Sequence, residues 1–464
     1  MRSLSAPSKV WAPLAVAAAA AVLAAGAVHA EIDAVVIPLV AALLILLGVC
    51  RLLLPTGTPI GRRVTHLAFV VLALHLLIGV VINSSSTLVS YLGGDAITYN
   101  QGAQAIVAHW RNSSAPFPFI GPGKEGFYYL LAGLYWAFGA FPVAGLAINA
   151  LFSASLVPVM FDLTRRLFGL RAGWVAALII SFQPGFLIWT SQLLREAGVM
   201  LFLGVAVNCA VRVSHETKLA PMVILALDLT ALLTFRADVA IMAAGGLGVG
   251  ILLGRRQVVG RALSVAAVTA VMVLLVTAVG VGNKGYQYTS SLSLQQVNVA
   301  RQELSAGVSS GFDTNANVST PGQALRYLPR GLPSFLLGPF PWQLHNVRQL
   351  LGGLEALTVL ALMVAVWWGW RSARTTKGAR RLLMLPATGL AISLALVIGN
   401  YGTVVRERLQ VVVFLIPLAA AGIVARRRAH EPEPEPEPEP ALSLRLGGRA
   451  RPAGSTVAGG SASG

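Results

Sequence analysis

A few charged side chains stand out because they lie in polar segments of an otherwise apolar chain. Asp95 follows Gly93-Gly94 and precedes Tyr99 by about one helical turn. A carboxylate at this place either caps the helix that follows it, a role in which Asp is favoured, or acts as a general base toward a hydroxyl group. The spacing alone leaves both interpretations open.

Lys124 ends the same polar segment, directly before the aromatic residues Phe127, Tyr128 and Tyr129. Lysine extends its ammonium group toward the membrane interface, and tyrosine is common in interfacial belts. An ammonium group here could equally bind the phosphate of a lipid carrier as a point charge. Lys124 is therefore a candidate for phosphate binding, with interfacial anchoring as the alternative.

Two more charged pairs lie in short turns between apolar runs. Arg195 precedes Glu196 directly, so the two could form a local ion pair, or Glu196 could be a second acid of a reaction site. Arg236 and Asp238 present the same choice between a local pair and a functional group. The sequence favours the local pair in both turns and leaves the functional role open.

The composition excludes a soluble protein. The chain has 464 residues, of which 56% are hydrophobic and 11% charged, whereas a soluble domain has about 25% charged residues. Lys and Arg number 35 against 18 Asp and Glu, but they fall in short clusters between apolar runs. Such clusters indicate orientation in a membrane rather than nucleic-acid binding. We therefore expect an all-α polytopic protein of the cell membrane, in contact with membrane lipids.

The apolar runs predict about 12 transmembrane helices. A bilayer core about 30 Å thick needs about 20 apolar residues per helix. A possible thirteenth element, 126–141, is short and aromatic, and we expect it to lie partly inserted or tilted at the outer surface. The predicted crossings are 12–30, 34–54, 64–82, 143–161, 172–190, 197–213, 219–235, 237–253, 261–281, 351–370, 382–399 and 409–425.

The basic clusters orient these crossings, because Lys and Arg are enriched in cytoplasmic loops. Placing every cluster in the cytoplasm leaves both termini inside and predicts two large outer loops, 83–125 and 282–350, that carry interfacial helices. In the first loop Ala103, Ile106, Val107 and Trp110 recur at helical spacing. The segments predicted outside are 83–142, 191–196, 236–238, 282–350 and 400–408.

Both ends of the chain differ from the middle. Residues 1–30 resemble a signal peptide, and we interpret them as an uncleaved first helix. Residues 1–425 then form one transmembrane domain. The remaining segment, 426–464, contains a Glu-Pro repeat at 431–440 and ends in Gly, Ala and Ser. Proline blocks helix formation and like charges repel, so this segment is predicted to be a disordered cytoplasmic tail.

Arg406 and Arg408 lie in a segment predicted to be outside, against the charge bias. Arginine binds phosphate bidentately, so both are candidates for contacts to a carrier phosphate. Asp228 lies within a predicted crossing, where a carboxylate is costly. It is either functional or a hydrogen-bond partner of neighbouring helices.

No cofactor or metal is indicated. The chain has no P-loop, no dinucleotide-binding motif, no Cys-x-x-Cys and no His-Glu-x-x-His. Its two cysteines, Cys50 and Cys209, lie in separate apolar runs and indicate neither a disulfide framework nor a metal site.

The order of these motifs resembles a known family. Asp95 and Tyr99 come first, Lys124 precedes paired aromatics, and Arg166-Leu167-Phe168-Gly169-Leu170-Arg171-Ala172 follows, with Pro184 after it. This order is similar to that of the GT-C membrane glycosyltransferases of the family 39 type, which include dolichyl-phosphate-mannose protein mannosyltransferases and lipid A aminoarabinose transferases. The resemblance covers roughly residues 64–215. The sequence departs from the family pattern at Ala96, where a second acid is usual.

The resemblance implies a glycosyltransferase that takes sugar from a polyprenyl-phosphate donor and passes it to a glycan, lipid or protein acceptor at the outer side of the membrane. Asp95 would be the general base and Glu196 a second catalytic acid; a divalent metal is possible but not indicated. Together with the charge pattern described above, the residues predicted to bind substrate are Tyr99, Lys124, Tyr128, Arg195, Arg236, Arg406 and Arg408. Two alternatives remain: an outer-surface polysaccharide polymerase, and a transporter or flippase of lipid-linked glycans, which Asp228 best supports.

Overall fold

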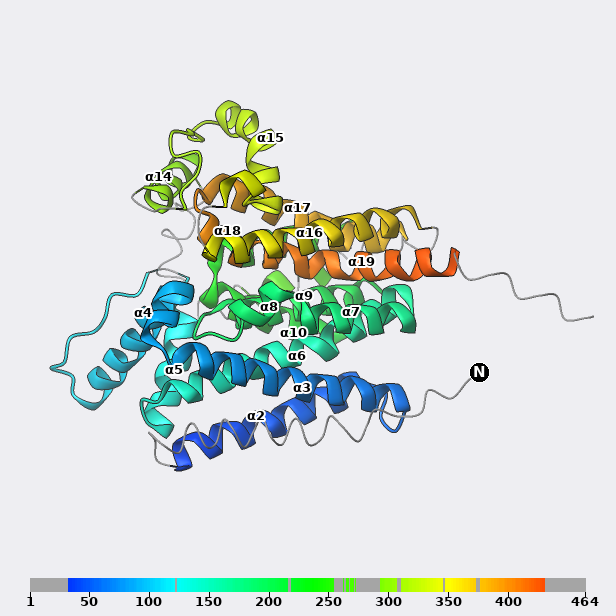
Figure 1. The fold of residues 1–464 in the computed structure, drawn as a ribbon. Coiled ribbons are helices and arrows are strands. Elements are labelled where there is room, and N and C mark those ends of the chain that lie inside the picture. The colour runs from blue at the N-terminus through cyan, green and yellow to red at the C-terminus, as the bar shows by residue number, and fades with distance from the viewer. Residues whose placement is uncertain are drawn as a thin grey trace, which may run out of the picture.

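The structure is a computed structural model built almost wholly of helices that lie side by side (Figure 1). It describes residues 32–121, 123–215, 218–253, 293–306, 310–344, 347–372 and 376–429, with several positions between 262 and 272. The predicted crossing 12–30, most of 261–281 and the tail beyond Ala429 lie outside the described residues.

Within the described residues, seven helices are long and apolar enough to cross a membrane, and three shorter apolar helices accompany them. All ten coincide with predicted crossings, so the chain has the fold of an all-α polytopic membrane protein. The long helices are α2 (Ile32–Leu53), α3 (Pro59–Asn83), α6 (Pro142–Phe168), α9 (Glu196–His215), α16 (Val347–Arg371), α17 (Lys377–Val397) and α19 (Leu409–Ala429). The shorter ones are α7 (Leu170–Phe182), α10 (Leu219–Phe235) and α11 (Ala237–Leu252).

The predicted crossing 172–190 is wrong in one respect, because it is not one continuous helix. The helix α7 ends at Phe182, and α8 (Pro184–Trp189) follows as a separate six-residue helix. The cause is Pro184, which disfavours helical geometry in the residue before it. Gln183 accordingly has extended backbone angles and caps α8 by accepting a hydrogen bond from the Phe186 amide.

Residues 190–195 between α8 and α9 are irregular, yet they are mostly buried. Buried backbone away from helices needs hydrogen-bond partners, and Asn149 of α6 supplies them. Its side-chain amide donates to the carbonyl groups of Gln192 at 2.5 Å and Leu194 at 2.8 Å. The hydroxyl of Thr190 lies within 3.0 Å of His75 Nε2 on α3. The break is therefore held in place from two neighbouring helices.

The helix α19 lies in the interior and packs most closely on α16. A Cβ atom added at Gly422 would lie 2.0 Å from the carbonyl oxygen of Ala365, and one at Gly369 would lie 2.0 Å from that of Leu418. Only glycine permits this approach, which is how small residues bring membrane helices together. The position of α19 matters because α18, directly before it, carries candidate site residues.

The helices of the two long loops gather at one end of the bundle. The first long loop forms α4 (Ser86–Arg111) and leads into the apolar α5 (Glu125–Phe138), and the second forms α14 (Leu294–Ser305), α15 (Pro321–Leu337) and the 3-10 turn η2 (Pro341–Gln343). Figure 1 shows α4, α5 and α18 (Tyr401–Glu407) at the same end, on the left. With 14 residues, α5 is too short to cross a bilayer core, as predicted for this run. We call this the loop end.

The opposite end carries the basic clusters, and we call it the basic end. Asp162 is fully buried there and binds Arg165 at 2.6 Å, Arg166 at 2.8 Å and Arg212 at 2.7 Å. Arg165 also donates to the carbonyl group of Leu53 at the end of α2. The clusters at Arg165–Arg166 and Arg212, far apart in the sequence, thus meet at one end, in agreement with a common side for both.

Candidate active site

A kink in α4 sets the position of Asp95. Gly93 has non-helical backbone angles (φ −151°, ψ 58°), so Asp95 stands in the first turn of the second half of the helix. A Cβ atom at Gly93 would lie 2.0 Å from the Gln192 side-chain oxygen, so any larger residue there would require the Gln192 side chain to move. The Asp95 carboxylate does not cap the helix. It binds a side chain from the other end of the sequence.

That partner is Arg406 on α18, 311 residues away. Its Nη1 atom donates to Asp95 Oδ2 at 2.7 Å, and its Nε atom lies 3.9 Å from Glu196 Oε1 at the start of α9. The Asp95 side chain is 59% exposed, whereas Arg406 is 14% and Glu196 4% exposed. Arg406 therefore joins an accessible carboxylate to a buried one.

A second ion-pair network adjoins the first. Arg236 Nη2 lies 2.5 Å from Glu407 Oε2, and both side chains are buried. The predicted pair between Arg236 and Asp238 is also present, at 3.5 Å. Because Arg406 and Glu407 are consecutive in α18, the two networks share one short helix. Sequence reasoning left Glu407 without a role, although its place between two arginines in an apolar segment was a signal.

Arg195 and Lys124 meet at the turn before α5. Arg195 does not pair with its neighbour Glu196 but donates through Nη1 to the carbonyl groups of Gly123 at 3.2 Å and Phe235 at 3.0 Å. Gly123 has a positive φ of 72°, and its Cα lies so close to α11 that an added Cβ would be 3.0 Å from the Ala237 amide nitrogen. This turn places the exposed Lys124 side chain at the loop end, beside Arg195.

The two tyrosines of the predicted site, Tyr99 and Tyr128, pack against each other. Tyr99 is buried, with its ring 5.1 Å from that of Phe127 and 5.0 Å from that of Tyr128. The Tyr128 ring occupies the space that a side chain at Gly102 would need. Burial raises the pKa of Tyr99 to about 12. These residues position α4 against α5 and thereby support Asp95.

The buried face of α4 agrees with its predicted helical spacing, with one exception. Ala103, Ile106 and Val107 are buried, as expected. Trp110 is 46% exposed and stacks on Tyr129 with the ring centroids 6.4 Å apart. The exception is understandable because a tryptophan at the last turn of an interfacial helix keeps part of its ring at the surface.

The structure places Arg408 apart from this cluster. Its guanidinium is fully buried and lies 3.2 Å from a carboxylate oxygen of Glu355 on α16. It also donates to the carbonyl groups of Gly338 at 2.5 Å and Gly352 at 3.2 Å. Arg408 thus ties the second long loop and α16 to the start of α19. The sequence analysis gave Glu355 no role, although a carboxylate inside the predicted crossing 351–370 was a signal of the same kind as Asp228.

The charges around Asp95 determine its protonation. Burial by itself raises the pKa of the Asp95 carboxyl, but Arg406, Lys124 and Arg195 lower it further than burial raises it, so the pKa lies below its usual value. Burial also lowers the pKa of Lys124, and repulsion from Arg195 adds to this. The nearby acids outweigh burial at Arg406 and raise its pKa. At neutral pH Asp95 is therefore ionised but held by a cation.

The cluster is electrically balanced, with four acids and four bases. Its acids are Asp95, Glu196, Asp238 and Glu407, and its bases are Lys124, Arg195, Arg236 and Arg406. An anion that enters must therefore compete with a carboxylate for a cation. In the part of the chain that the structure describes, no three His, Cys, Asp or Glu side chains are placed to hold a metal ion.

The similarity of this chain to known proteins is limited to solved structures. No protein-family model matches the sequence, and no curated protein matches it. Among solved structures, the chain is similar to ArnT from Cupriavidus metallidurans bound to undecaprenyl phosphate, with a TM-score of 0.45 and 14% sequence identity. The alignment covers 69% of this chain and 55% of the ArnT chain, so the chain spans little more than half the length of that protein.

Proposed function

We propose that the chain is a membrane glycosyltransferase that moves a sugar from a polyprenyl-phosphate donor to an acceptor at the outer face of the membrane. The observation that carries the proposal is the contact between Asp95 and Arg406 at 2.7 Å. One is the side chain expected to act as a base and the other is expected to bind phosphate. They come from opposite ends of the sequence and share one site.

The donor phosphate would bind between Arg406, Lys124 and Arg195. Arg195 uses only Nη1 for its two backbone carbonyls, which leaves the other side of its guanidinium for an anion. Phosphate oxygens would compete with the Asp95 carboxylate for Arg406. Because Arg406 lowers the pKa of Asp95, release from this pair makes Asp95 a stronger base. Donor binding would thereby prepare the catalytic base.

In the reaction itself, Asp95 would accept the proton of an acceptor hydroxyl group while the oxygen of that hydroxyl group attacks the anomeric carbon of the sugar. The bond between that carbon and the phosphate oxygen breaks, and polyprenyl phosphate leaves with the electron pair. One displacement inverts the anomeric centre. Cationic groups fixed around the leaving phosphate stabilise the charge that develops on it, often a large contribution to catalysis. Glu196 would hold Arg406 in place from the buried side.

Exposed apolar side chains precede this site along the chain and would form a surface suited to the lipid tail of the donor. Leu77 and Val81 on α3, and Leu88 and Tyr91 on the first half of α4, are exposed apolar side chains. They follow one another along the chain up to the kink two residues before Asp95. A polyprenyl chain lying in the bilayer along this surface would bring its phosphate to the level of Arg406.

The outer location of the site rests on the charge bias. All five segments predicted outside contribute to the loop end, and the basic clusters described lie at the other end. Because Lys and Arg are enriched on the cytoplasmic side, the loop end would face outward. A lipid-linked donor fits this side, since it needs no nucleotide.

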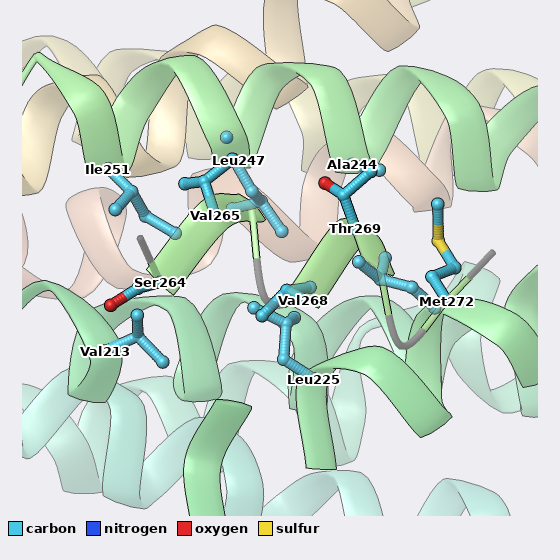
Figure 2. Close-up of a pocket in the computed structure, with 12 residues that line it drawn as sticks. Val213, Leu225, Ala244, Leu247, Ile251, Ser264, Val265, Val268, Thr269 and Met272 are labelled. Atoms are coloured by element: carbon cyan, nitrogen blue, oxygen red, sulfur yellow. The ribbon is translucent and has the colours of Figure 1, made fainter. Parts of the chain in front are cut away.

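Transport of a lipid-linked glycan is less well supported. Asp228 is buried in α10, and its Oδ2 atom has no hydrogen-bond partner. The nearby cavity between α9, α10, α11 and residues 264–272 measures about 50 Å³ and is lined mainly by aliphatic side chains (Figure 2). Ligand pockets are commonly about 300–1,000 Å³. This cavity would not hold a sugar.

The proposal is tested by sugar transfer in proteoliposomes. The purified full-length protein receives radiolabelled polyprenyl-phosphate sugars and a cell-envelope extract from the source organism as acceptor, and label leaving the lipid fraction is measured. Asp95→Asn should abolish transfer at normal expression. Glu303→Gln, which changes an exposed carboxylate on α14, should leave it unchanged. Full transfer by Asp95→Asn would contradict the proposal. A product in which the transferred sugar belongs to a glycan that still carries the lipid carrier would favour a polymerase instead.

A further inference from the structure

A second cavity, with a polar lining, lies beside α18, between the second long loop and the start of that helix. It measures about 290 Å³, and its lining includes Phe312, Asp313, Arg330, Trp342, Gln343 and Tyr401. An antiparallel bridge joins the loop to the helix here: the Phe312 amide donates to Gly399 at 2.8 Å, and the Tyr401 amide donates to Ser310 at 3.0 Å. The cavity is thus formed by elements that are fixed to each other.

Two stacked aromatic pairs form its walls. The rings of Phe312 and Tyr401 lie 4.3 Å apart at an angle of 21°, and those of Phe340 and Trp342 lie 5.0 Å apart at 9°. The Trp342 side chain is 73% exposed although it lies in a short ordered turn. The exposed Trp342 ring offers a flat apolar face next to water, a surface that the C–H face of a sugar ring can cover.

A held carboxylate faces the same cavity. Asp313 is largely buried and pairs with the exposed Arg330, and it accepts a hydrogen bond from the Tyr327 hydroxyl at 3.2 Å. Tyr327 is held by the fully buried Arg301, which donates to its oxygen at 2.6 Å and to the carbonyl group of Ile398 at 3.0 Å. Asp313 has a positive φ of 49°, which Asp tolerates better than most residues. Its position is therefore fixed by the fold.

The chemistry of the lining distinguishes between ligands. A carboxylate, an amide and a guanidinium offer acceptors and donors suited to neighbouring hydroxyl groups. Among the lining residues a phosphate headgroup would find one cation, Arg330, which is already paired with Asp313, whereas three cations act on Asp95. A neutral polyol with one apolar face meets all of these conditions. The lining therefore favours a sugar ring over a lipid headgroup.

The cavity is close to the candidate active site. Tyr401 and Arg406 belong to the same short helix, and a rise of about 1.5 Å per residue places their Cα atoms about 8 Å apart along it. We propose that this cavity binds the acceptor, and that the acceptor is a glycan. The inference rests on the proposed transferase function and selects a glycan among the three possible acceptors, which are a glycan, a lipid and a protein. An extended glycan held here would present its end to Asp95.

Binding can be measured without transfer. Oligosaccharides released from the cell envelope of the source organism are labelled with a fluorophore at the reducing end, fractionated, and titrated with the full-length protein in lipid nanodiscs. We expect at least one fraction to bind, and Trp342→Ala to weaken its affinity about tenfold or more. Arg330→Ala should also weaken it. Trp136→Ala, which removes a tryptophan that is 61% exposed on α5, should have no effect.

Each other outcome has a definite meaning. If no fraction binds, or if Trp342→Ala binds like the wild-type protein, the inference is overturned. If Trp342→Ala alters only the stability of the protein in lipid, Trp342 is an interfacial anchor and the inference is likewise overturned. Glycan binding without transfer from any donor would overturn the proposed function and the acceptor role with it, whereas transfer without glycan binding would overturn this inference alone.

Discussion

Replacing Arg406 by alanine should reduce sugar transfer strongly. The side chain contacts Asp95 at 2.7 Å and lies 3.9 Å from Glu196, and in the proposed reaction it would move to the donor phosphate. Removing one fixed donor to a developing negative charge costs about 2.7–4 kcal/mol, or about 10²–10³ in rate. Because the donor phosphate must displace Asp95 from Arg406 in the wild-type protein, loss of this exposed pair offsets at most about 1 kcal/mol of that cost. A net loss of about a hundredfold in kcat/KM is therefore expected.

The same substitution should move the pH dependence in a defined direction. Arg406 lowers the pKa of Asp95 by charge and by hydrogen bonding, against the opposing effect of burial. Without Arg406 the pKa of Asp95 rises, so a larger fraction of Asp95 is protonated at a given pH. The acidic limb of the rate profile, where the base becomes protonated, should shift to higher pH in Arg406→Ala.

The assay is transfer from a labelled polyprenyl-phosphate sugar in proteoliposomes over a range of donor concentrations and pH values. Arg406→Lys keeps the charge but not the forked geometry, so its activity should lie between those of wild type and Arg406→Ala. Arg326→Ala removes an exposed arginine on α15 and is the matched control. Activity of Arg406→Ala within threefold of wild type, or an acidic limb that stays in place, would refute the reasoning.

Three further predictions concern the surroundings of the site. Glu407→Gln leaves Arg236 buried beside a neutral partner, and losing one member of a buried pair costs about 3–5 kcal/mol. The unfolding temperature in detergent should therefore fall clearly, and an unchanged unfolding temperature would count against the pairing. Gly93→Ala places a Cβ atom 2.0 Å from the Gln192 oxygen, so transfer should fall and Gln192→Ala should restore part of it; full activity of the single variant would show that the kink is unimportant. Arg408→Ala removes contacts to a carboxylate and to backbone carbonyls in the interior, so it should lower stability while the apparent affinity for donor stays unchanged in the protein that folds; a selective rise in KM for the donor would assign Arg408 to the phosphate after all.

The membrane helices could be read from the sequence because their signal is local. An apolar run of sufficient length needs no knowledge of its neighbours, and ten predicted crossings coincide with described helices. The count of 12 stays a prediction. The error at 172–190 concerns Pro184, before which the helix ends, whereas Pro158, Pro386 and Pro417 lie inside continuous helices. A proline in an apolar run is therefore an ambiguous signal of a helix boundary.

The candidate site was only partly accessible from the sequence. Asp95 and Arg406 stood out because each is a charge in an unexpected place, and the resemblance to a family gave them roles. Their pairing depends on how α18 packs against α4, which no local pattern encodes. For the same reason the partners Glu407 and Glu355 were missed. Both are acids in apolar surroundings, and each made sense only when its arginine was placed beside it.

The central claim is that Asp95 and a donor phosphate compete for Arg406, and it can be tested by measuring the binding of polyprenyl phosphate to Asp95→Asn in nanodiscs. This variant should transfer no sugar yet bind polyprenyl phosphate more tightly than the wild-type protein. The gain should be up to about fivefold, because an exposed ion pair contributes about 0.2–1 kcal/mol. Equal or weaker binding would contradict the account, because Asp95 would then not share its cation with the donor.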